Sequence, residues 1–482
     1  MLFNSIDFAI FLPIVFLLYW FVFKRNLKLQ NLFVVVASYV FYGWWDVRFL
    51  WLILFSTATD YIVGLCLLNE ERERRRKMFL WISVLVNIGF LGFFKYFNFF
   101  IDSFVTAFSF FGTPIEARSF NIILPVGISF YTFQTMSYTI DVYRRKFEPT
   151  KDFVAFSAFI SFFPLLVAGP IERATNFLPQ FYTKRTFDYS KAVDGLRQIL
   201  WGLFKKMVIA DNCATIVNTI FNNSDSYSGS TLVIGVLFFA FQVYGDFSGY
   251  SDIAIGTARL FGFNAMKNFA FPYFSRNVAE FWRRWHISLT TWFRDYVYIP
   301  LGGSRGGTLM KVRNVFILFL VSGFWHGANW TYVAWGALHA VLFIPSMLSK
   351  NNRKYIEIVA HGKKLPTIKE FFQMLGTFIL LAFPLIIFRS DDLNHTWRYT
   401  SEIFSSSLFT MPAFPDIYYA MKTACFVIIF MIIEWIGREN EYAIEKIGMN
   451  RNIFFRLALY YGITLAILYF GGEEQQFIYF QF

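Results

Sequence analysis

The sequence predicts an all-α integral membrane protein that crosses the bilayer ten or twelve times. Of its 482 residues, 56% are hydrophobic and only 16% are charged, whereas soluble domains average about 45–50% apolar and about 25% charged residues. A span needs about 20 apolar residues, so this composition allows at most about 13 spans. The same numbers exclude a disordered, collagen-like or disulfide-stapled protein and disfavour a soluble enzyme of several domains.

The distribution of charge agrees with this fold class. Lys and Arg total 44 against 32 Asp and Glu, which gives a net charge of +12. The charges lie in short runs between apolar segments, a positive-inside pattern rather than a nucleic-acid footprint, so no nucleic acid is expected as a partner. The three cysteines (Cys66, Cys213 and Cys425) are far apart and show no CxxC or Cys/His spacing. We therefore expect neither a disulfide framework nor a metal site.

The first apolar run, Ile6–Phe23, is followed by Lys24 and Arg25. A signal peptide has its positive charge before the apolar core, so this order predicts a retained helix with its N-terminus outside. The next runs alternate in direction, which brings the basic segment 72–77 to the cytoplasmic side. These runs cover residues 32–45, 49–68 and 79–100.

The rest of the chain continues the alternation with less regular segments. Residues 222–230 contain no Lys or Arg and read as an outer loop, whereas 267–313 are basic and rich in Trp, Pro and Gly. We interpret 267–313 as cytoplasmic and partly re-entrant. The remaining apolar runs are 124–140, 153–167, 232–247, 315–324, 331–347, 371–388, 423–437 and 453–470.

Both termini are expected outside, because Lys and Arg do not occur after Arg456. Two outer ends require an even number of spans. The sequence contains no linker long enough to separate domains, so residues 1–482 are interpreted as a single transmembrane domain with an outer tail at 471–482.

His326 is the most informative ionisable residue. It lies in a Gly-flanked stretch between two apolar runs that are bounded by basic clusters near Lys311 and Lys350, which predicts a hairpin. The 12 residues from Arg313 to Phe324 would climb about 18 Å as a helix, short of the roughly 30 Å hydrocarbon core. The turn is therefore expected at membrane depth. An ionisable residue there indicates function, and a neutral imidazole suits a general base.

His286 lies in the run 281–292, which is both aromatic and basic. One interpretation is an interfacial helix with Trp anchors, in which Arg283 and Arg284 extend their charges to the surface. The other is a cationic mouth for an acidic cytoplasmic donor with His286 near its path. His339 is interpreted as a packing histidine and is left out of the site.

Two carboxylates, Asp246 and Asp252, stand six residues apart around Gly249. Because Ser and Asp commonly cap helices, Asp252 is expected to cap a helix that begins after Ser251. Asp246 is the better candidate for an orienting role or a structural ion pair.

Several segments taken together resemble one enzyme family. The runs 285–292 (WHISLTTW) and 325–330 (WHGANW) resemble the two histidine motifs of the membrane-bound O-acyltransferase family. Further blocks resemble its bacterial branch, the alginate O-acetyltransferase group, to which teichoic-acid D-alanyl transferases are related. These blocks are 124–130, 140–144, 168–173, 246–252 and the terminal 477–482. They occur in order over most of the chain and are specific as a set.

The resemblance implies helices around a central funnel or tunnel in the bacterial inner membrane. A cytoplasmic thioester, acetyl-CoA or another acyl thioester, would supply an acyl group for an exported polysaccharide or cell-wall glycan. A periplasmic acetyltransferase or esterase-like partner would complete the transfer, and no permanently bound cofactor is implied. His326 matches the essential histidine of the family, His286 the accompanying polar position, and Tyr479 the terminal tyrosine.

Acyl transfer requires a base, a group that polarises the carbonyl, and exclusion of water. His326 would be the base. The indoles of Trp325 and Trp330, the amide of Asn329 or backbone N–H groups would polarise the carbonyl. Two other functions fit the spans. A transporter or flippase would favour paired charges or repeats at the midplane, and a non-catalytic scaffold for an outer acetyltransferase would tolerate loss of His326.

The charge pattern makes a testable prediction about topology. In a cysteine-free background, Ser226→Cys should react with a membrane-impermeant thiol reagent added outside, whereas Arg74→Cys should be protected until the membrane is permeabilised. The opposite labelling pattern would reverse the orientation.

Overall fold

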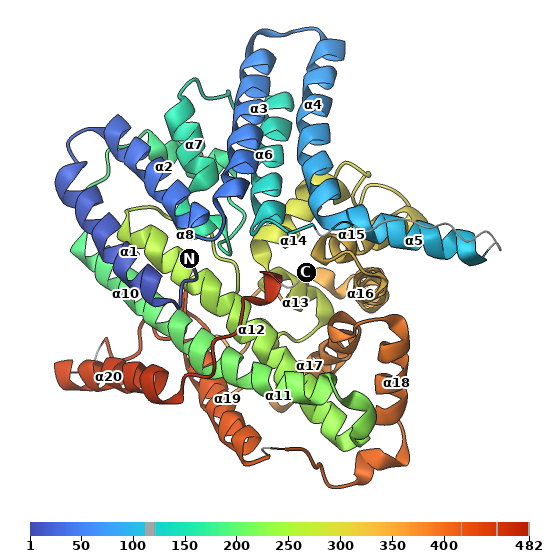
Figure 1. Ribbon diagram of the computed structural model, residues 1–482. Coiled ribbons are helices and arrows are strands. Elements are labelled where there is room, and N and C mark those ends of the chain that lie inside the picture. The colour runs from blue at the N-terminus through green and yellow to red at the C-terminus, as the bar shows by residue number, and fades with distance from the viewer. Residues whose placement is uncertain (111–119, 121, 416, 450–451, 481–482) are drawn as a thin grey trace. The chain divides into compact units, whose positions relative to one another are not determined.

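The computed structural model describes residues 1–110, 120, 122–415, 417–449 and 452–480, and these residues form helices and loops without a strand (Figure 1). Gln481 and Phe482 of the terminal motif lie outside the described residues. The chain divides into two compact units, 1–192 with 258–266, and 193–257 with 267–482. The interpretation of residues 1–482 as one transmembrane domain therefore stays a prediction.

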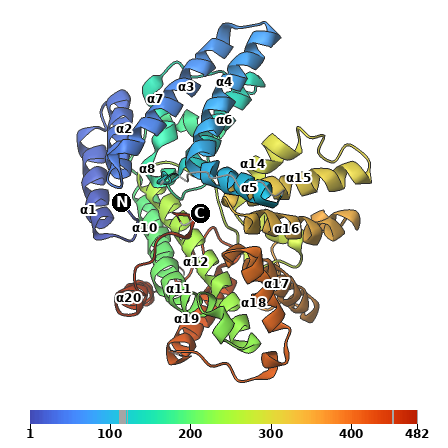
Figure 2. The ribbon, with the colours of Figure 1, turned by 45° about the vertical axis from the view of Figure 1, so that its right-hand side comes forward.

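In the first unit, the helices α3, α4 and α6 lie side by side (Figures 1 and 2). A buried polar cluster joins them, because the carboxylate of Asp60 on α3 accepts hydrogen bonds from Asn87 on α4 (2.8 Å) and Thr139 on α6 (2.9 Å). The unit contains α1 (Ile6–Leu17), η1 (Leu18–Val22), α2 (Leu27–Gly43), η2 (Val47–Phe49), α3 (Leu50–Asn69), α4 (Glu73–Leu91), η3 (Gly92–Tyr96), α5 (Phe97–Phe110), α6 (Ile128–Tyr143), α7 (Phe153–Ser161), α8 (Phe163–Leu166), α9 (Ala174–Phe177), η4 (Leu178–Phe181) and the start of α10 (Tyr189–Leu203).

The second unit holds all of the candidate site residues that the sequence identified. It contains the rest of α10, η5 (Phe204–Ala210), α11 (Asp211–Phe221), η6 (Ser224–Ser226), most of α12 (Gly229–Leu260), η7 (Pro272–Phe274), α13 (Val278–Arg284), α14 (Ile287–Phe293), η8 (Arg294–Tyr298), α15 (Thr308–His326), α16 (Trp330–Leu348), η9 (Asn351–Arg353), α17 (Ile368–Arg389), α18 (Leu393–Ile403), η10 (Ser406–Phe409), α19 (Ile417–Gly437), α20 (Ile453–Phe470) and η11 (Ile478–Phe480).

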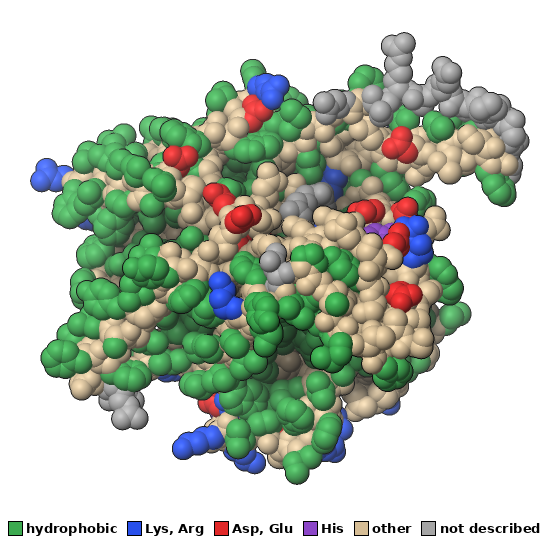
Figure 3. All heavy atoms as spheres, turned by 60° about the horizontal axis from the view of Figure 1, so that its bottom comes forward, with side chains coloured by type: hydrophobic (Ala, Val, Ile, Leu, Met, Phe, Trp, Pro, Cys, Tyr) green, Lys and Arg blue, Asp and Glu red, His purple; other side chains and the backbone are tan. Residues whose placement is uncertain are grey.

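Eight helical segments among the described residues are long and apolar enough to cross a membrane: 47–69, 73–110, 229–260, 308–326, 330–348, 368–389, 417–437 and 453–470. With two shorter apolar helices, 6–22 and 27–43, the number of spans would reach ten, the lower of the two values predicted from the sequence. Large hydrophobic side chains such as Phe21, Trp51 and Leu85 are exposed, and hydrophobic side chains cover much of the face seen in Figure 3. The protein is an all-α, multi-pass membrane protein.

The predicted helix cap at Asp252 is wrong. The structure continues α12 without interruption from Gly229 to Leu260, so Asp252 lies inside a helix. Its carboxylate instead pairs with the buried ammonium of Lys205 at 2.5 Å. The ion pair predicted for Asp246 is confirmed, because its Oδ1 lies 2.9 Å from Nζ of Lys206.

Glycines bring these groups together by letting two helices approach closely. A Cβ on Gly249 of α12 would lie 2.8 Å from the carbonyl oxygen of Gly202, and one on Gly202 of α10 would lie 2.6 Å from that of Gly249. A Cβ on Gly256 would meet the carbonyl of Gly195 at 2.5 Å. Backbone therefore packs on backbone along this contact, a geometry that small residues permit between membrane helices.

The predicted hairpin around His326 is confirmed by α15 and α16, which lie side by side (Figure 2). The helix α15 has 19 residues and begins at Thr308, so it rises about 28 Å, close to the hydrocarbon thickness. The helix therefore begins five residues before Arg313, from which the shorter rise was expected. Helix length therefore no longer supports the prediction of a turn at membrane depth.

The hairpin packing predicts that Gly336 cannot carry a large side chain. A Cβ there would lie 2.3 Å from the carbonyl oxygen of Phe319, whereas one on Gly376 would meet nothing within 4 Å. We expect Gly336→Leu to lower the free energy of unfolding by about 1–3 kcal/mol, the usual cost of overpacking. Thermal melting of the purified protein in detergent would measure this, and equal melting of the Gly336→Leu and Gly376→Leu variants would contradict it.

Candidate active site

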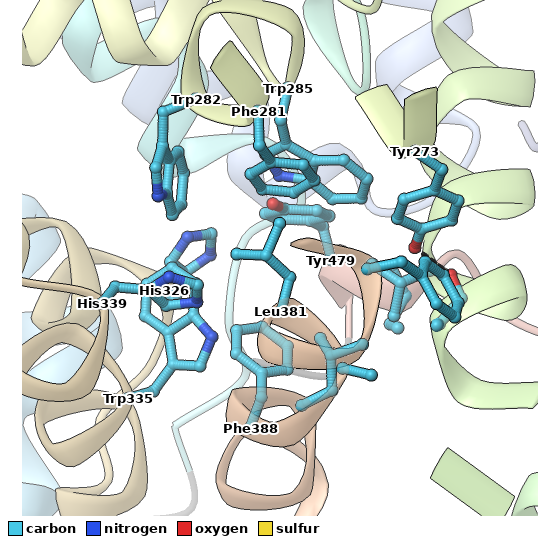
Figure 4. A pocket seen from close by; sticks show the side chains of 16 residues that line it. Tyr273, Phe281, Trp282, Trp285, His326, Trp335, His339, Leu381, Phe388 and Tyr479 are labelled. Carbon is cyan, nitrogen blue, oxygen red and sulfur yellow. Dashed lines mark hydrogen bonds between the residues drawn. The ribbon is translucent and has the colours of Figure 1, made fainter. Parts of the chain in front are cut away.

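An aromatic cavity of about 50 Å³ lies inside the second unit (Figure 4). Its lining side chains come from segments far apart in sequence, including α12, α13, α16, α17 and the C-terminal tail. They are Ala240, Val243, Tyr273, Phe281, Trp282, Trp285, His326, Trp335, His339, Phe378, Leu381, Ala382, Leu385, Phe388, Ile478 and Tyr479. The cavity is mostly apolar and has a small number of polar atoms at its boundary, as small-molecule sites usually do.

His326 is the last residue of α15 and lines this cavity. The chain turns directly after it at Gly327, where a Cβ would lie 2.1 Å from the ring of Tyr332. The imidazole is buried between aromatic rings, with centroid distances of 5.0 Å to Trp335 and 5.4 Å to Phe388. The Gly-flanked break seen in the sequence therefore places this imidazole in an apolar, enclosed environment.

Tyr479 reaches the same cavity from the C-terminal tail, where η11 makes a single turn. Its ring centroid lies 5.7 Å from that of His326 and 4.5 Å from that of Phe247. In Figure 4 its hydroxyl points toward the side of the cavity that holds His326 and Trp282. Burial raises the pKa of Tyr479 well above its ordinary value, so the phenol is protonated at neutral pH and requires a base before it can act as a nucleophile.

His286 lies beside this pair in a strained backbone conformation. It precedes α14 with φ of 42°, a left-handed conformation that costs a non-glycine residue about 1–2 kcal/mol, and such strain clusters at functional sites. The Nδ1 atom lies 3.0 Å from Oδ1 of Asn268, whose Nδ2 donates to Ser251. Nδ1 therefore carries the proton and Nε2 the lone pair.

The imidazole of His286 is uncharged under physiological conditions. Burial lowers its pKa to about 3, so protonation would require strong acid. Its ring centroid lies 6.2 Å from that of Tyr479. The structure thus brings together the three predicted residues, His326, His286 and Tyr479.

The residues that flank His326 occupy different environments. Trp325 packs on His326 at 5.1 Å and on His286 at 6.2 Å between ring centroids. Asn329 caps α16 by accepting from the backbone of Thr331, and its Nδ2 donates to the carbonyl oxygen of Asp391. Trp330 is 56% exposed. The positions of Asn329 and Trp330, outside the cavity lining, do not support the carbonyl-polarising role expected of them.

The two arginines before His286 are bound by acceptors within the protein. Arg284 pairs with the buried carboxylate of Glu280 at 2.8 Å, and Glu280 also binds Arg276 at 3.0 Å. Arg283 donates to the carbonyl oxygens of Asn352 and Tyr355. The two contacts of Arg283 hold α13 against the segment after α16.

Arg283 also lines a second cavity of about 490 Å³ between α13, α14, α15 and α16. Arg294 and Arg353 contribute two more positive charges, while Leu289, Phe319 and other apolar side chains form most of the rest. Trp282 lines both cavities and so lies between them.

Three residues of the site were not predicted from the sequence: Trp282 on α13, and Trp335 and His339 on α16. The rings of Trp335 and His339 have centroids 4.4 Å apart, and His339 also packs on Trp282 at 5.0 Å. Residues four apart share a helix face, and this spacing after the His326 turn was the available signal. His339, interpreted as a packing residue, therefore belongs to the cavity lining.

Three buried polar atoms of the lining have no hydrogen-bond partner in the part of the chain that the structure describes: Nε1 of Trp282, Nε1 of Trp335 and Nδ1 of His339. Buried polar atoms are normally paired, so each exception calls for a physical reason.

Among the described residues, no group of three or more His, Cys, Asp or Glu side chains could hold a metal ion.

The fold and the cavity define a polytopic helical membrane protein with an imidazole and a phenol in one enclosed site. Residues 149–387 match the model of the MBOAT, membrane-bound O-acyltransferase family. The chain belongs to this family and is an O-acyltransferase.

The similarity to known proteins extends over most of the chain. It is 40% identical to the probable alginate O-acetylase AlgI of Pseudomonas aeruginosa, over 84% of this chain and 75% of the relative. It is 34% identical to the peptidoglycan O-acetyltransferase of Helicobacter pylori, over 82% and 78%. It is also 29% identical to the teichoic acid D-alanyltransferase of Bacillus subtilis, over 57% and 71%.

Proposed function

We propose that this protein takes an acetyl group from a cytoplasmic thioester, acetyl-CoA, and passes it outward for O-acetylation of an exported polysaccharide or cell-wall glycan. The observation that carries the proposal is the imidazole of His326 beside the phenol of Tyr479 in one enclosed cavity. The names of relatives more than 30% identical, among them an alginate O-acetylase and a peptidoglycan O-acetyltransferase, support the reaction and the acceptor class. We place the protein in the bacterial inner membrane with both termini outside.

The second cavity is the proposed entry for the donor. Arg294 and Arg353 suit the phosphate groups of acetyl-CoA, because a guanidinium binds phosphate through paired N–H donors, and Arg283 adds a positive charge to the same lining. The sequence assigns 267–313 to the cytoplasmic side, where this donor occurs. The smaller cavity beyond Trp282 measures about 50 Å³, which suits a short acyl group such as acetyl rather than a fatty chain.

Transfer to Tyr479 needs one proton acceptor. His326 takes the phenol proton as the phenolate oxygen attacks the thioester carbonyl carbon. A C–O bond forms, the C–S bond breaks, and the proton passes from His326 to the departing thiolate. The raised pKa of Tyr479 keeps the phenol protonated, so without this base the attack is slow.

Indole donors are the proposed carbonyl polarisers. The Nε1 atoms of Trp282 and Trp335 belong to residues that line the reaction cavity, are buried and have no hydrogen-bond partner among the described residues. The negative charge that develops on the carbonyl oxygen would meet these N–H donors in a water-poor environment, where hydrogen bonds act strongly. This assignment replaces Asn329, whose Nδ2 donates to the carbonyl oxygen of Asp391.

The aryl ester on Tyr479 is a better acyl donor than an alkyl ester, because a phenolate is the better leaving group. A serine hydroxyl of a periplasmic acetyltransferase or esterase-like partner would attack this ester, and Tyr479 would regain a proton as it is released. The partner would then acetylate the polymer.

Loss of the base should stop the reaction. We expect His326→Ala to fold and insert normally but to lower acetyl transfer by about 10²–10⁴-fold, the usual worth of a positioned general base. His286→Ala should lower transfer less, because its neutral ring contacts Tyr479 without being assigned the proton. The measurement is acetyl release from acetyl-CoA by the purified protein with its secreted partner, and full activity of an inserted His326→Ala variant would remove the catalytic assignment.

The carrier role of Tyr479 makes a separate prediction. Tyr479→Phe keeps the ring and removes only the nucleophile, so transfer to the outer acceptor should be abolished while donor binding persists. Tyr469→Phe is the matched control, since Tyr469 on α20 is 77% exposed. With radiolabelled acetyl-CoA, label should appear on the tail peptide of the unmodified protein. Normal glycan acetylation by Tyr479→Phe would favour direct transfer assisted by His326.

A further inference from the structure

Hydrogen bonds to the backbone of the C-terminal tail join it to η5 and α12. The N–H of Gly472 donates to the carbonyl of Met207 at 2.9 Å, and Nζ of Lys206 donates to the carbonyl of Gln475 at 2.9 Å. Closest to the cavity, the N–H of Ile478 donates to Oδ2 of Asp246 at 2.7 Å. These bonds run along the tail and end one residue before Tyr479.

Asp246 can accept this bond because a buried lysine orients its carboxylate. Nζ of Lys206 lies 2.9 Å from Oδ1 of Asp246 and 2.7 Å from Oδ1 of Asp211, and all three side chains are at most 4% exposed. Lys206 thus holds one oxygen of Asp246 and leaves the other for Ile478. A hydrogen bond to an ionised acceptor is among the stronger ones in proteins.

The short distance along the chain couples this bond to the site. Ile478 begins the single turn η11, in which Phe480 N–H donates to the carbonyl of Phe477. Phe477 is fully buried and packs on Tyr250 with ring centroids 4.4 Å apart. With the main chain bonded at Ile478 and the ring of Phe477 buried, the ring centroid of Tyr479 lies 5.7 Å from that of His326.

We propose that Asp246, oriented by Lys206, is a positioning residue that holds the tail backbone at Ile478 so that Tyr479 lies beside His326. This inference rests on the proposed function only because it takes Tyr479 to be the residue that carries the acyl group. The clasp, defined as Lys206, Asp246 and the backbone of Gln475 and Ile478, acts through geometry and does not touch the reacting atoms.

The chain supplies a matched control for a purely structural role. Lys205 and Asp252 form a second buried ion pair, at 2.5 Å, between the same two elements, η5 and α12. Asp252 also accepts from Gln198 at 2.8 Å, and none of these contacts involves the tail. If the ion pairs only hold η5 against α12, removal of either carboxylate has the same effect on the tail.

The test follows the tail directly and measures activity separately. In a cysteine-free background that carries Phe480→Cys, a half-buried reporter, we expect Asp246→Ala to speed thiol labelling by about tenfold or more, in line with loss of a hydrogen bond to a charged group. Asp252→Ala should leave the labelling rate near that of the parent. Without the reporter, Asp246→Ala should lower kcat by about 10²-fold, as misplacement of a reacting group does, with KM for acetyl-CoA unchanged.

The possible outcomes separate the clasp from the carrier role. Unchanged labelling in Asp246→Ala, or equal acceleration in Asp252→Ala, overturns the clasp whatever the activity. Faster labelling in Asp246→Ala together with full activity of Tyr479→Phe retains the clasp and removes the carrier role. If Asp246→Ala does not insert, Asp246→Asn and Asp252→Asn form the same comparison, and equal labelling of that pair also overturns the clasp.

Discussion

The site depends on two lysines that are buried next to each other in η5. A buried ammonium is costly unless a counterion meets it at short range, and Lys205 and Lys206 meet Asp252 and Asp246 on α12 at 2.5 and 2.9 Å. The ammonium and carboxylate groups come this close because the backbones of α10 and α12 pack directly on each other at their glycines. The ion pairs fix α12, which contributes Ala240 and Val243 to the cavity lining, and Asp246 also binds the tail.

The sequence predicted features that depend on local pattern. The apolar runs and basic clusters predicted the spans and the hairpin, and the Gly-flanked break predicted the position of His326. Asp246 was correctly assigned an ion pair, but its partner, Lys206, lies 40 residues earlier in the chain, and no local pattern encodes that distance. At Asp252 a local capping preference gave the wrong answer, because the pairing of Lys205 across the helix contact outweighs it.

The cavity combines little charge with several polar atoms. His286 stays neutral because burial lowers its pKa to about 3, and the raised pKa of Tyr479 keeps its phenol neutral. Charge on these groups then develops only during a reaction. In surroundings of low dielectric, a charge without a compensating partner is energetically unfavourable. The buried indole N–H groups of Trp282 and Trp335 are therefore better placed to lower a barrier than to stabilise the resting fold. The spacing of Trp335 and His339 could indicate a shared helix face, but no local pattern shows that the indole N–H groups of Trp282 and Trp335 lack a partner among the described residues.

The tail shows why composition alone could not separate an anchor from a functional element. Phe477 and Tyr479 fit a membrane-interface anchor equally well by residue type. In the structure Phe477 is fully buried against Tyr250, and the backbone bonds to Met207, Lys206 and Asp246 do not depend on tail side chains. The aromatic pattern thus serves to bury the tail in protein, while main-chain bonds set its register. Under this division of roles, conservative changes at exposed tail positions such as Glu474 leave the register intact, whereas the single carboxylate of Asp246 controls where the phenol of Tyr479 lies.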